Sequence, residues 1–140
     1  MTADDIIKKL DLAPHPEGGW YRQTWVAKDG PRASGTCIYF LLKEGERSHW
    51  HRVDAAEIWH FYAGTPLRLG IAETEEGPAN WQMLGPALDT GQVPQILVPP
   101  HYWQAAEATD GWGLVGCTVS PGFQFEGFEL APKGFNIPAA

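Results

Sequence analysis

From Trp20 onward the sequence is a succession of short segments rich in aromatic and β-branched residues, the composition that strands favour. Glycine, proline, aspartate or asparagine separates most of these segments, as expected for strands joined by tight turns. After residue 11 no window of helical length keeps a 3.6-residue period. The predicted strands are WYRQTWV, TCIYFLL, EIWHFYAG, LRLGIA, WQML, QILV, YWQAAEA, GLVGCTV and FQFEGFEL. This succession predicts an all-β sandwich or barrel.

One short helix precedes the predicted strands. Thr2 and Asp5 resemble a capping box, and apolar residues recur at helical spacing, so we expect a helix over residues 3–11. The prolines and glycines of residues 13–19 cannot continue it. A chain of 140 residues with 44% hydrophobic content suffices for one core. We therefore predict a single domain over residues 1–140, with its barrel at about 20–130.

The charge distribution argues against two classes of partner. The formal net charge is -7, and residues 69–140 contain Lys133 as their single basic side chain. Without a polybasic run, nucleic acid and anionic membrane are poor partners for this chain. The start MTADDIIKKL lacks the features of a signal peptide, and no apolar run approaches the ~20 residues of a membrane span. These features predict a cytoplasmic protein. Cys37 and Cys117 lie in apolar runs, where buried free thiols behave as small hydrophobic groups, and the sequence leaves a disulfide between them open.

Two histidines and a glutamate carry the strongest signal for chemistry. His49 and His51 are two residues apart, so on a strand both project to the same face. Glu57 opens the next strand after a turn at 53–56, and a hairpin brings it beside them. Such a group suits a divalent metal or metal-free acid–base chemistry. It is also compatible with a structural role, in which Glu57 pairs with an arginine.

The spacing of these residues resembles the first conserved motif of the cupins, in which HxH is followed by a glutamate and then by a glycine. Here five residues separate His51 from Glu57, and six separate Glu57 from Gly64. In the second cupin motif a histidine ligand follows a proline turn. Pro99 matches that turn, and Gln104 stands at the histidine position. Glutamine is a weak ligand for transition metals, which disfavours a metal site.

Several further segments resemble, in order, the cupin type 5 family, which has no settled reaction. They are LAPHPEGGWY, TCIYFLL, EIWHFYAG, GQVPQ and GCTVSPGF, and the resemblance spans about residues 5–131. It implies a double-stranded β-helix, or jelly-roll, barrel and a homodimer. It also implies a pocket similar to those of nucleotide-sugar epimerases that work without a metal.

The residues expected to act in this pocket fall into three groups. We expect His51 and Glu57 to be catalytic, because they match the family pattern and form an ionisable pair. Residues expected to bind the substrate are Tyr21, Arg22, Trp59, Phe61, Trp103 and Gln104. The alternative metal ligands are His49, His51, Glu57 and Gln104. His60 differs in parity from Glu57 and Trp59, so it should face away from the pocket.

Three functional hypotheses remain open from the sequence. The first is an isomerase or epimerase with no cofactor, in which His51 is the general base, Glu57 orients it and Arg22 holds an anionic group. The second is a non-catalytic module that binds a small metabolite such as a sugar or nucleotide derivative. The third is a metal-dependent cupin enzyme, a dioxygenase or isomerase, with a divalent ion as cofactor.

Overall fold

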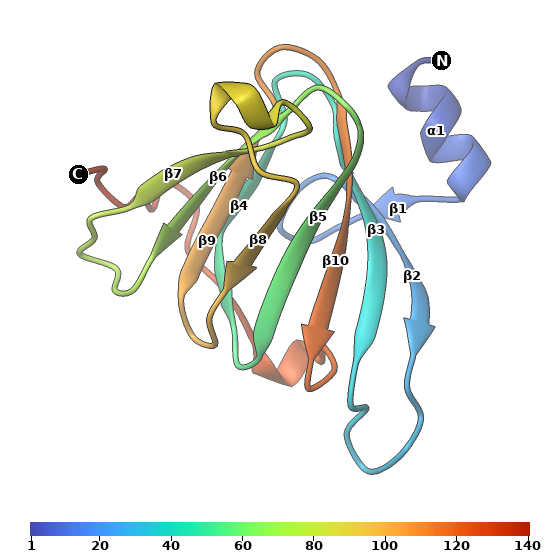
Figure 1. The fold of residues 1–140 in the computed structure, drawn as a ribbon. Helices are drawn as coiled ribbons and strands as arrows, with labels where there is room; N and C mark the ends of the chain where they lie inside the picture. The colour runs from blue at the N-terminus through green and yellow to red at the C-terminus, as the bar shows by residue number, and fades with distance from the viewer.

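The computed structural model describes residues 1–140 and contains two antiparallel β-sheets that face each other (Figure 1). The six-stranded sheet comprises, in spatial order, β1 (Ala13–Pro14), β2 (Trp20–Val26), β3 (Thr36–Leu42), β10 (Gly113–Ser120), β5 (Ala56–Gly64) and β8 (Gln95–Val98). The five-stranded sheet comprises β11 (Phe128–Leu130), β4 (Arg47–Val53), β9 (Trp103–Glu107), β6 (Leu67–Ala72) and β7 (Asn80–Leu84). This arrangement confirms the predicted jelly-roll barrel with a short N-terminal helix.

The N-terminal helix α1 (Ala3–Leu10) lies outside the six-stranded sheet (Figure 1). Its capping box is present, because the Thr2 hydroxyl accepts the backbone N–H of Asp5 and the Asp5 carboxylate accepts that of Thr2. Ile6 is the helix's buried residue and packs in a cluster with Leu12 and Leu41. Ala3, Ile7 and Leu10 pack at the edge of the same cluster, so the apolar face of the helix holds it against the sheet.

Replacing Thr2 with alanine should destabilise the protein by about 1 kcal/mol, the usual cost of losing an N-cap side chain. The Asp5 backbone N–H would lose its acceptor, while the buried contacts of Ile6 would remain. Urea unfolding of the Thr2→Ala and Thr2→Ser variants tests this. Serine should restore the wild-type midpoint, and equal losses in both variants would contradict the capping role.

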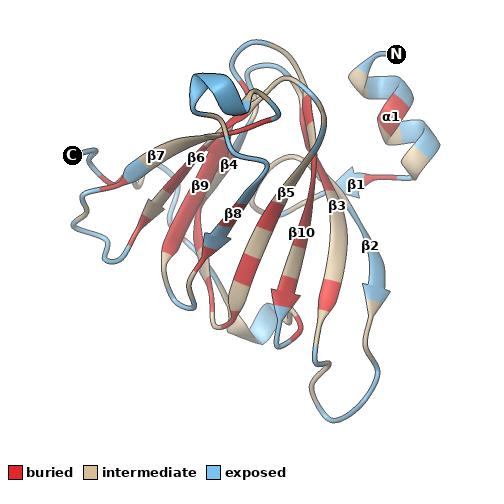
Figure 2. Ribbon diagram, in the orientation of Figure 1, coloured by how far each residue is buried: buried red, intermediate tan, exposed pale blue.

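The core between the sheets is built from alternate residues of facing strands. Phe40, Trp59, Leu69 and Val115 belong to this central cluster. Figure 2 shows buried residues in red along β3, β5, β9 and β10. A second cluster lies on the outer side of the five-stranded sheet, where Trp50, Trp103 and Ala105 are covered by the C-terminal segment through Ile137. Apolar side chains therefore line both faces of the five-stranded sheet. Because neighbours on a strand point to opposite faces, Trp103 and Ala105 of β9 lie on the outer face and Ala106 lies on the inner face.

The predicted turn between the histidine strand and Glu57 is confirmed, since β4 ends at Val53 and β5 begins at Ala56. The predicted strand FQFEGFEL is wrong in its first half. Residues 125–127 form the 3₁₀ helix η2 (Phe125–Gly127), and β11 begins only at Phe128. A second 3₁₀ helix, η1 (Leu88–Thr90), precedes β8. The first half cannot be a strand, because the Phe123 N–H donates to the Thr36 hydroxyl and Gly127 N–H to the Gln124 carbonyl.

Cys37 and Cys117 are both free. Cys37 pairs in register with Thr118, and Cys117 with Ile38, so the two cysteines occupy adjacent register positions on β3 and β10. Adjacent positions point to opposite faces of a sheet, which keeps the two thiols apart.

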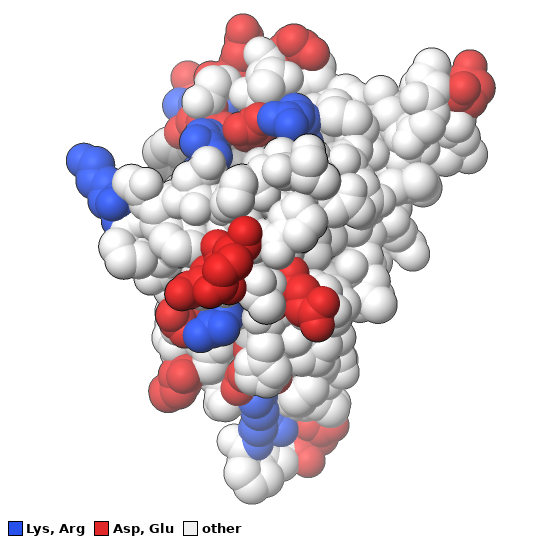
Figure 3. All heavy atoms as spheres, turned by 90° about the vertical axis from the view of Figure 1, so that its left-hand side faces the viewer, with Lys and Arg blue, Asp and Glu red and all other residues white.

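None of the helices is long and apolar enough to cross a membrane. On the face that Figure 3 presents, acidic and basic side chains are scattered over a largely uncharged surface without a continuous basic patch.

Candidate functional site

A cavity of about 130 Å³ lies between the two sheets. Three of the predicted site residues, His51, Glu57 and Tyr21, line it. The other lining residues are His15, Glu17, Gln23, Thr36, Ile38, Val53, Cys117, Val119, Phe123 and Phe125. Phe125 is 53% exposed, so the cavity reaches the surface beside η2. Its lining combines two imidazoles and two carboxyls, the side chains that most often transfer protons in enzymes.

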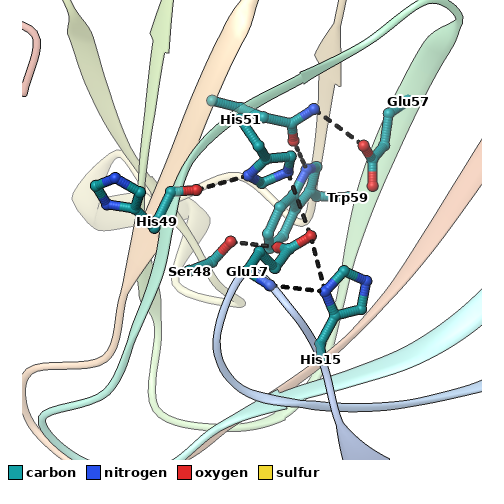
Figure 4. Close-up of polar contacts among 8 residues, drawn as sticks. His15, Glu17, Ser48, His49, His51, Glu57 and Trp59 are labelled. Carbon is teal, nitrogen blue, oxygen red and sulfur yellow. Dashed lines mark hydrogen bonds and ion pairs between the residues drawn. The ribbon is translucent and has the colours of Figure 1, made fainter. Parts of the chain in front are cut away.

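His51 is held in one orientation by its own strand. Its Nδ1 lies 2.7 Å from the backbone carbonyl oxygen of His49, which is an acceptor, so Nδ1 carries the proton of the neutral ring. The lone pair is therefore on Nε2, which faces Glu17 (Figure 4). His51 is 1% exposed, and this burial lowers the pKa of its imidazole. The ring is thus a neutral base that presents one lone pair to the cavity.

Glu17 lies between two histidines. Its Oε1 is 3.3 Å from His15 Nδ1 and 3.5 Å from His51 Nε2, and its Oε2 accepts the hydroxyl of Ser48 (Figure 4). His15 Nδ1 also accepts the backbone N–H of Glu17 at 3.1 Å, so it too is an acceptor. An ionised carboxylate would place lone pairs against both ring nitrogens, and a protonated carboxyl group has a hydrogen to donate to one of them.

The protonation of this trio follows from burial. Desolvation raises the pKa of Glu17 to about 8, because it penalises the charged carboxylate. Desolvation lowers the pKa of His15 to about 4. At neutral pH Glu17 and the two rings are therefore all neutral, and the contacts between them are not ion pairs. The buried trio holds one transferable proton, on a carboxyl group beside a free imidazole lone pair.

Glu57 is positioned from the opposite sheet. The Gln104 side-chain amide donates to Glu57 Oε1 at 3.0 Å, and Gln104 Oε1 accepts the indole N–H of Trp59 at 2.7 Å. Burial raises the pKa of Glu57 to about 7, which the nearby negative charge of ionised Glu17 favours and the imidazole of His51 opposes. The group that orients His51 is thus the His49 carbonyl, and Glu57 is held by Gln104 rather than by the histidine.

The predicted pairing of His49 and His51 on one face is wrong. The register of β4 with β9 shifts between Ser48 and His51, so a bulge interrupts the alternation. His49 Nε2 lies 3.0 Å from the carbonyl oxygen of Pro132, and the ring points away from the cavity (Figure 4). Ser48 and His51, three residues apart, instead both point toward Glu17.

Two residues predicted to bind substrate lie on outer faces. The Arg22 guanidinium lies 5.7 Å from the Tyr39 ring on the outer side of the six-stranded sheet. Trp103 packs in the outer cluster, with Arg52 4.7 Å above its ring. Each is a sequence neighbour of an inward residue, Tyr21 or Gln104, and neighbours on a strand point to opposite faces. Arg22 therefore cannot hold an anionic group in this cavity.

Two further predictions need correction in detail. Trp59 faces inward but is fully buried in the central cluster, where it supports Gln104 rather than lining the cavity. Phe61 packs against the same cluster away from the cavity. His60 faces the other way, as predicted, with Nε2 3.0 Å from the Thr118 hydroxyl.

The four predicted metal ligands do not converge. His49 points to Pro132 outside the cavity, and the Gln104 carbonyl oxygen already accepts the Trp59 indole N–H. Only His51 and Glu57 of the four remain at the cavity, and two protein donors do not make the three or four that such sites provide. This set therefore does not fit a divalent ion.

Sequence reasoning missed His15, Glu17 and Ser48. His15 and Glu17 belong to the Pro- and Gly-rich turn before β2, where no periodicity indicates which side chains point inward. The backbone carbonyl of Glu17 also accepts the N–H of His49, which ties this turn to β4. The available signal was an ionisable pair within the segment HPEGG, which carries the family resemblance.

The sequence matches the family described as Cupin superfamily (DUF985) over residues 4–131. The chain belongs to this cupin family. No curated protein matches it.

Solved structures of similar proteins agree with the family assignment. Protein SO0799 from Shewanella oneidensis is 44% identical, with a TM-score of 0.87 over 94% of this chain and 85% of that one. A hypothetical protein from Leishmania major is 30% identical, with a TM-score of 0.86 over 96% and 90% of the two chains. A cupin-2 domain protein from Rhodospirillum rubrum is 15% identical, with a TM-score of 0.63 over 89% of this cupin and 77% of that protein, and shares only the fold. The family is one of unknown function, and a shared fold does not determine the reaction.

Proposed function

We propose that this cupin is a metal-independent isomerase or epimerase that acts on a small polar metabolite. The observation that carries the proposal is the fixed tautomer of His51, whose Nε2 lone pair points into the cavity because Nδ1 is bound to the His49 carbonyl. A neutral imidazole suits removal of a proton from a carbon next to a carbonyl group.

The reaction would need two residues of the buried trio, His51 and Glu17. His51 Nε2 would take the C–H proton, which leaves an enolate on the substrate and an imidazolium ring. Protonated Glu17, with its pKa raised to about 8, would supply a proton to the enolate oxygen or to carbon, and the imidazolium would return a proton to Glu17 across 3.5 Å. No proton is gained or lost over the cycle.

The lining limits the size and charge of the substrate. A nucleotide diphosphate would need cationic partners, and the cavity lining contains no lysine or arginine. Its volume of about 130 Å³ is also below the range of about 300–1,000 Å³ typical of pockets for larger ligands. These features favour a free sugar fragment or another small carbonyl compound over a nucleotide sugar.

Carbon–hydrogen exchange in D2O tests the proposal, because it detects proton removal whichever product the enzyme forms. Hydroxyacetone and aminoacetone, two three-carbon methyl ketones, serve as probes, with deuterium incorporation followed by NMR. The wild-type protein should accelerate exchange in at least one of them. The variant His51→Asn should reduce this acceleration by about 100-fold or more, the usual contribution of a general base.

His60→Asn is the matched control, because His60 lies on the outer face against Thr118. This control variant should exchange at the wild-type rate, and circular dichroism should show that both variants fold. Exchange by His51→Asn at the wild-type rate, or wild-type exchange no faster than buffer with both probes, would refute the proposal.

A further inference from the structure

The cavity is lined by acidic side chains but by no lysine or arginine. Glu17 and Glu57 both line it, and neither has a lysine or arginine partner. Arg32, which reaches the chain beside Phe123, is bound to Asp54 and to the Gly122 carbonyl. The cavity thus offers two carboxyl groups and no compensating positive side chain.

The two imidazoles do not supply that positive charge. His15 and His51 are both buried, and desolvation lowers the pKa of each ring, so neither is protonated at neutral pH. The remaining polar side chains, which come from Tyr21, Gln23, Thr36 and Cys117, are neutral. Burial raises the pKa of the Cys117 thiol well above its usual value. An anionic ligand would therefore meet only carboxyls and neutral groups.

Aromatic rings complete the lining. Tyr21, Phe123 and Phe125 line the same cavity, with the Phe123 and Phe125 rings 5.0 Å apart. The faces of aromatic rings attract a desolvated cation, and a buried positive charge is stable only where an opposite charge can pair with it. The three rings meet the first condition, and the Glu57 carboxyl, whose pKa of about 7 leaves it ionised at slightly alkaline pH, meets the second.

We propose that the cavity of this cupin takes a small organic cation, a compound with one ammonium group that pairs with Glu57 and donates to the carbonyl oxygen of the Glu17 carboxyl group while its carbon skeleton contacts Tyr21, Phe123 and Phe125. The inference rests on the proposed function, because it names the charge class of the metabolite for the same pocket. The cavity of about 130 Å³ lies below the range of about 300–1,000 Å³ typical of pockets for larger ligands, so the cation is small.

Binding of three compounds with one branched four-carbon skeleton tests this inference. The probes are 2-methylpropylamine, which is cationic at pH 7.5, its neutral analogue 2-methylpropan-1-ol, and the anion isobutyrate. Each is titrated into isotope-labelled protein, and amide chemical shifts report binding. The amine should bind at least about tenfold more tightly than the alcohol, a difference of about 1.4 kcal/mol, and isobutyrate should bind more weakly than either.

Variants of the two carboxyls locate the charge recognition. Glu57→Gln should weaken binding of the amine about tenfold and leave that of the alcohol nearly unchanged, because only the amine needs the carboxylate. Glu17→Gln keeps a carbonyl oxygen in place of the protonated carboxyl group and should change the affinity for the amine much less. Glu75→Gln makes the same chemical change at an exposed turn residue and should alter neither affinity. If Glu57→Gln fails to fold, the order of affinities of the wild type for the amine, the alcohol and isobutyrate still tests the inference.

The inference is overturned if the alcohol or isobutyrate binds as tightly as the amine, or if a folded Glu57→Gln variant keeps wild-type affinity for the amine. These results concern binding alone. Loss of deuterium exchange in His51→Asn with hydroxyacetone would then still support the proposed function, so the two ideas fail separately.

Discussion

Replacing Glu17 with glutamine should remove most of the pH dependence of stability between pH 6.5 and 8.5. In the folded protein burial raises the pKa of Glu17 from 4.5 to about 8. The unfolded chain therefore ionises this carboxyl well below pH 6.5, while the folded protein keeps it protonated. The stability that Glu17 contributes is complete below pH 4.5 and is lost as the pH rises toward 8.

The expected size of this effect follows from the same linkage. Between pH 6.5 and 8 the free energy of unfolding falls by about 1.36 kcal/mol per pH unit, or about 2 kcal/mol in all. For a chain of 140 residues this lowers the melting temperature by about 8 °C. Glu57, with its pKa raised to about 7, contributes in the same direction over the lower part of this window. His15 acts only at lower pH, since its stability is lost as the pH falls from 6.5 to about 4.

Thermal unfolding of the wild type, Glu17→Gln and Glu75→Gln at pH 6.5, 7.5 and 8.5 measures the effect. Glutamine can still accept the Ser48 hydroxyl, so the fold should persist. The wild type and the Glu75→Gln control should lose about 8 °C across the series, and Glu17→Gln much less. If Glu17→Gln loses as much as the wild type, Glu17 is not the buried acid that we infer.

The variant Gln104→Leu should be strongly destabilised, although leucine fills a similar volume. Gln104 is 1% exposed and links the Trp59 indole N–H to the Glu57 carboxyl. Leucine leaves the buried indole without an acceptor and the carboxyl without its amide donor. Each unsatisfied buried group costs about 1–3 kcal/mol, so we expect a loss of about 3 kcal/mol.

A double-mutant cycle with Trp59→Phe separates this loss from general repacking. Phenylalanine has no N–H group, so in that background Gln104→Leu leaves one orphaned group fewer. The two substitutions together should cost about 1–2 kcal/mol less than their sum in urea unfolding. Gln95→Leu, at an exposed position of β8, is the control and should change stability little. Strict additivity would show that Gln104 and Trp59 do not act through their hydrogen bond.

The local sequence predicted most of the elements because their signals are local. The Thr2–Asp5 capping box, the strand at 36–42 and the turn before Glu57 all formed as expected. Strand parity also correctly predicted that Glu57 and His60 face opposite ways. The prediction of substrate-binding residues ignored strand alternation at two places. It expected the neighbours Tyr21 and Arg22, and likewise Trp103 and Gln104, to face inward together. The structure places one of each pair outside.

What the sequence alone determined is the barrel, because strand alternation and turn residues act over a few neighbours. The resemblance to the cupin motif added the inward position of His51 and Glu57. What only the tertiary structure decided is the chemistry of the cavity. The bulge at Ser48–His51 depends on how β4 pairs with β9, and it removes His49 from the site. Glu17 and His15 reach His51 because the turn before β2 is hydrogen-bonded to β4, and burial there keeps Glu17 protonated. Neither contact has a local pattern, because both depend on segments that meet only after the sheets have closed.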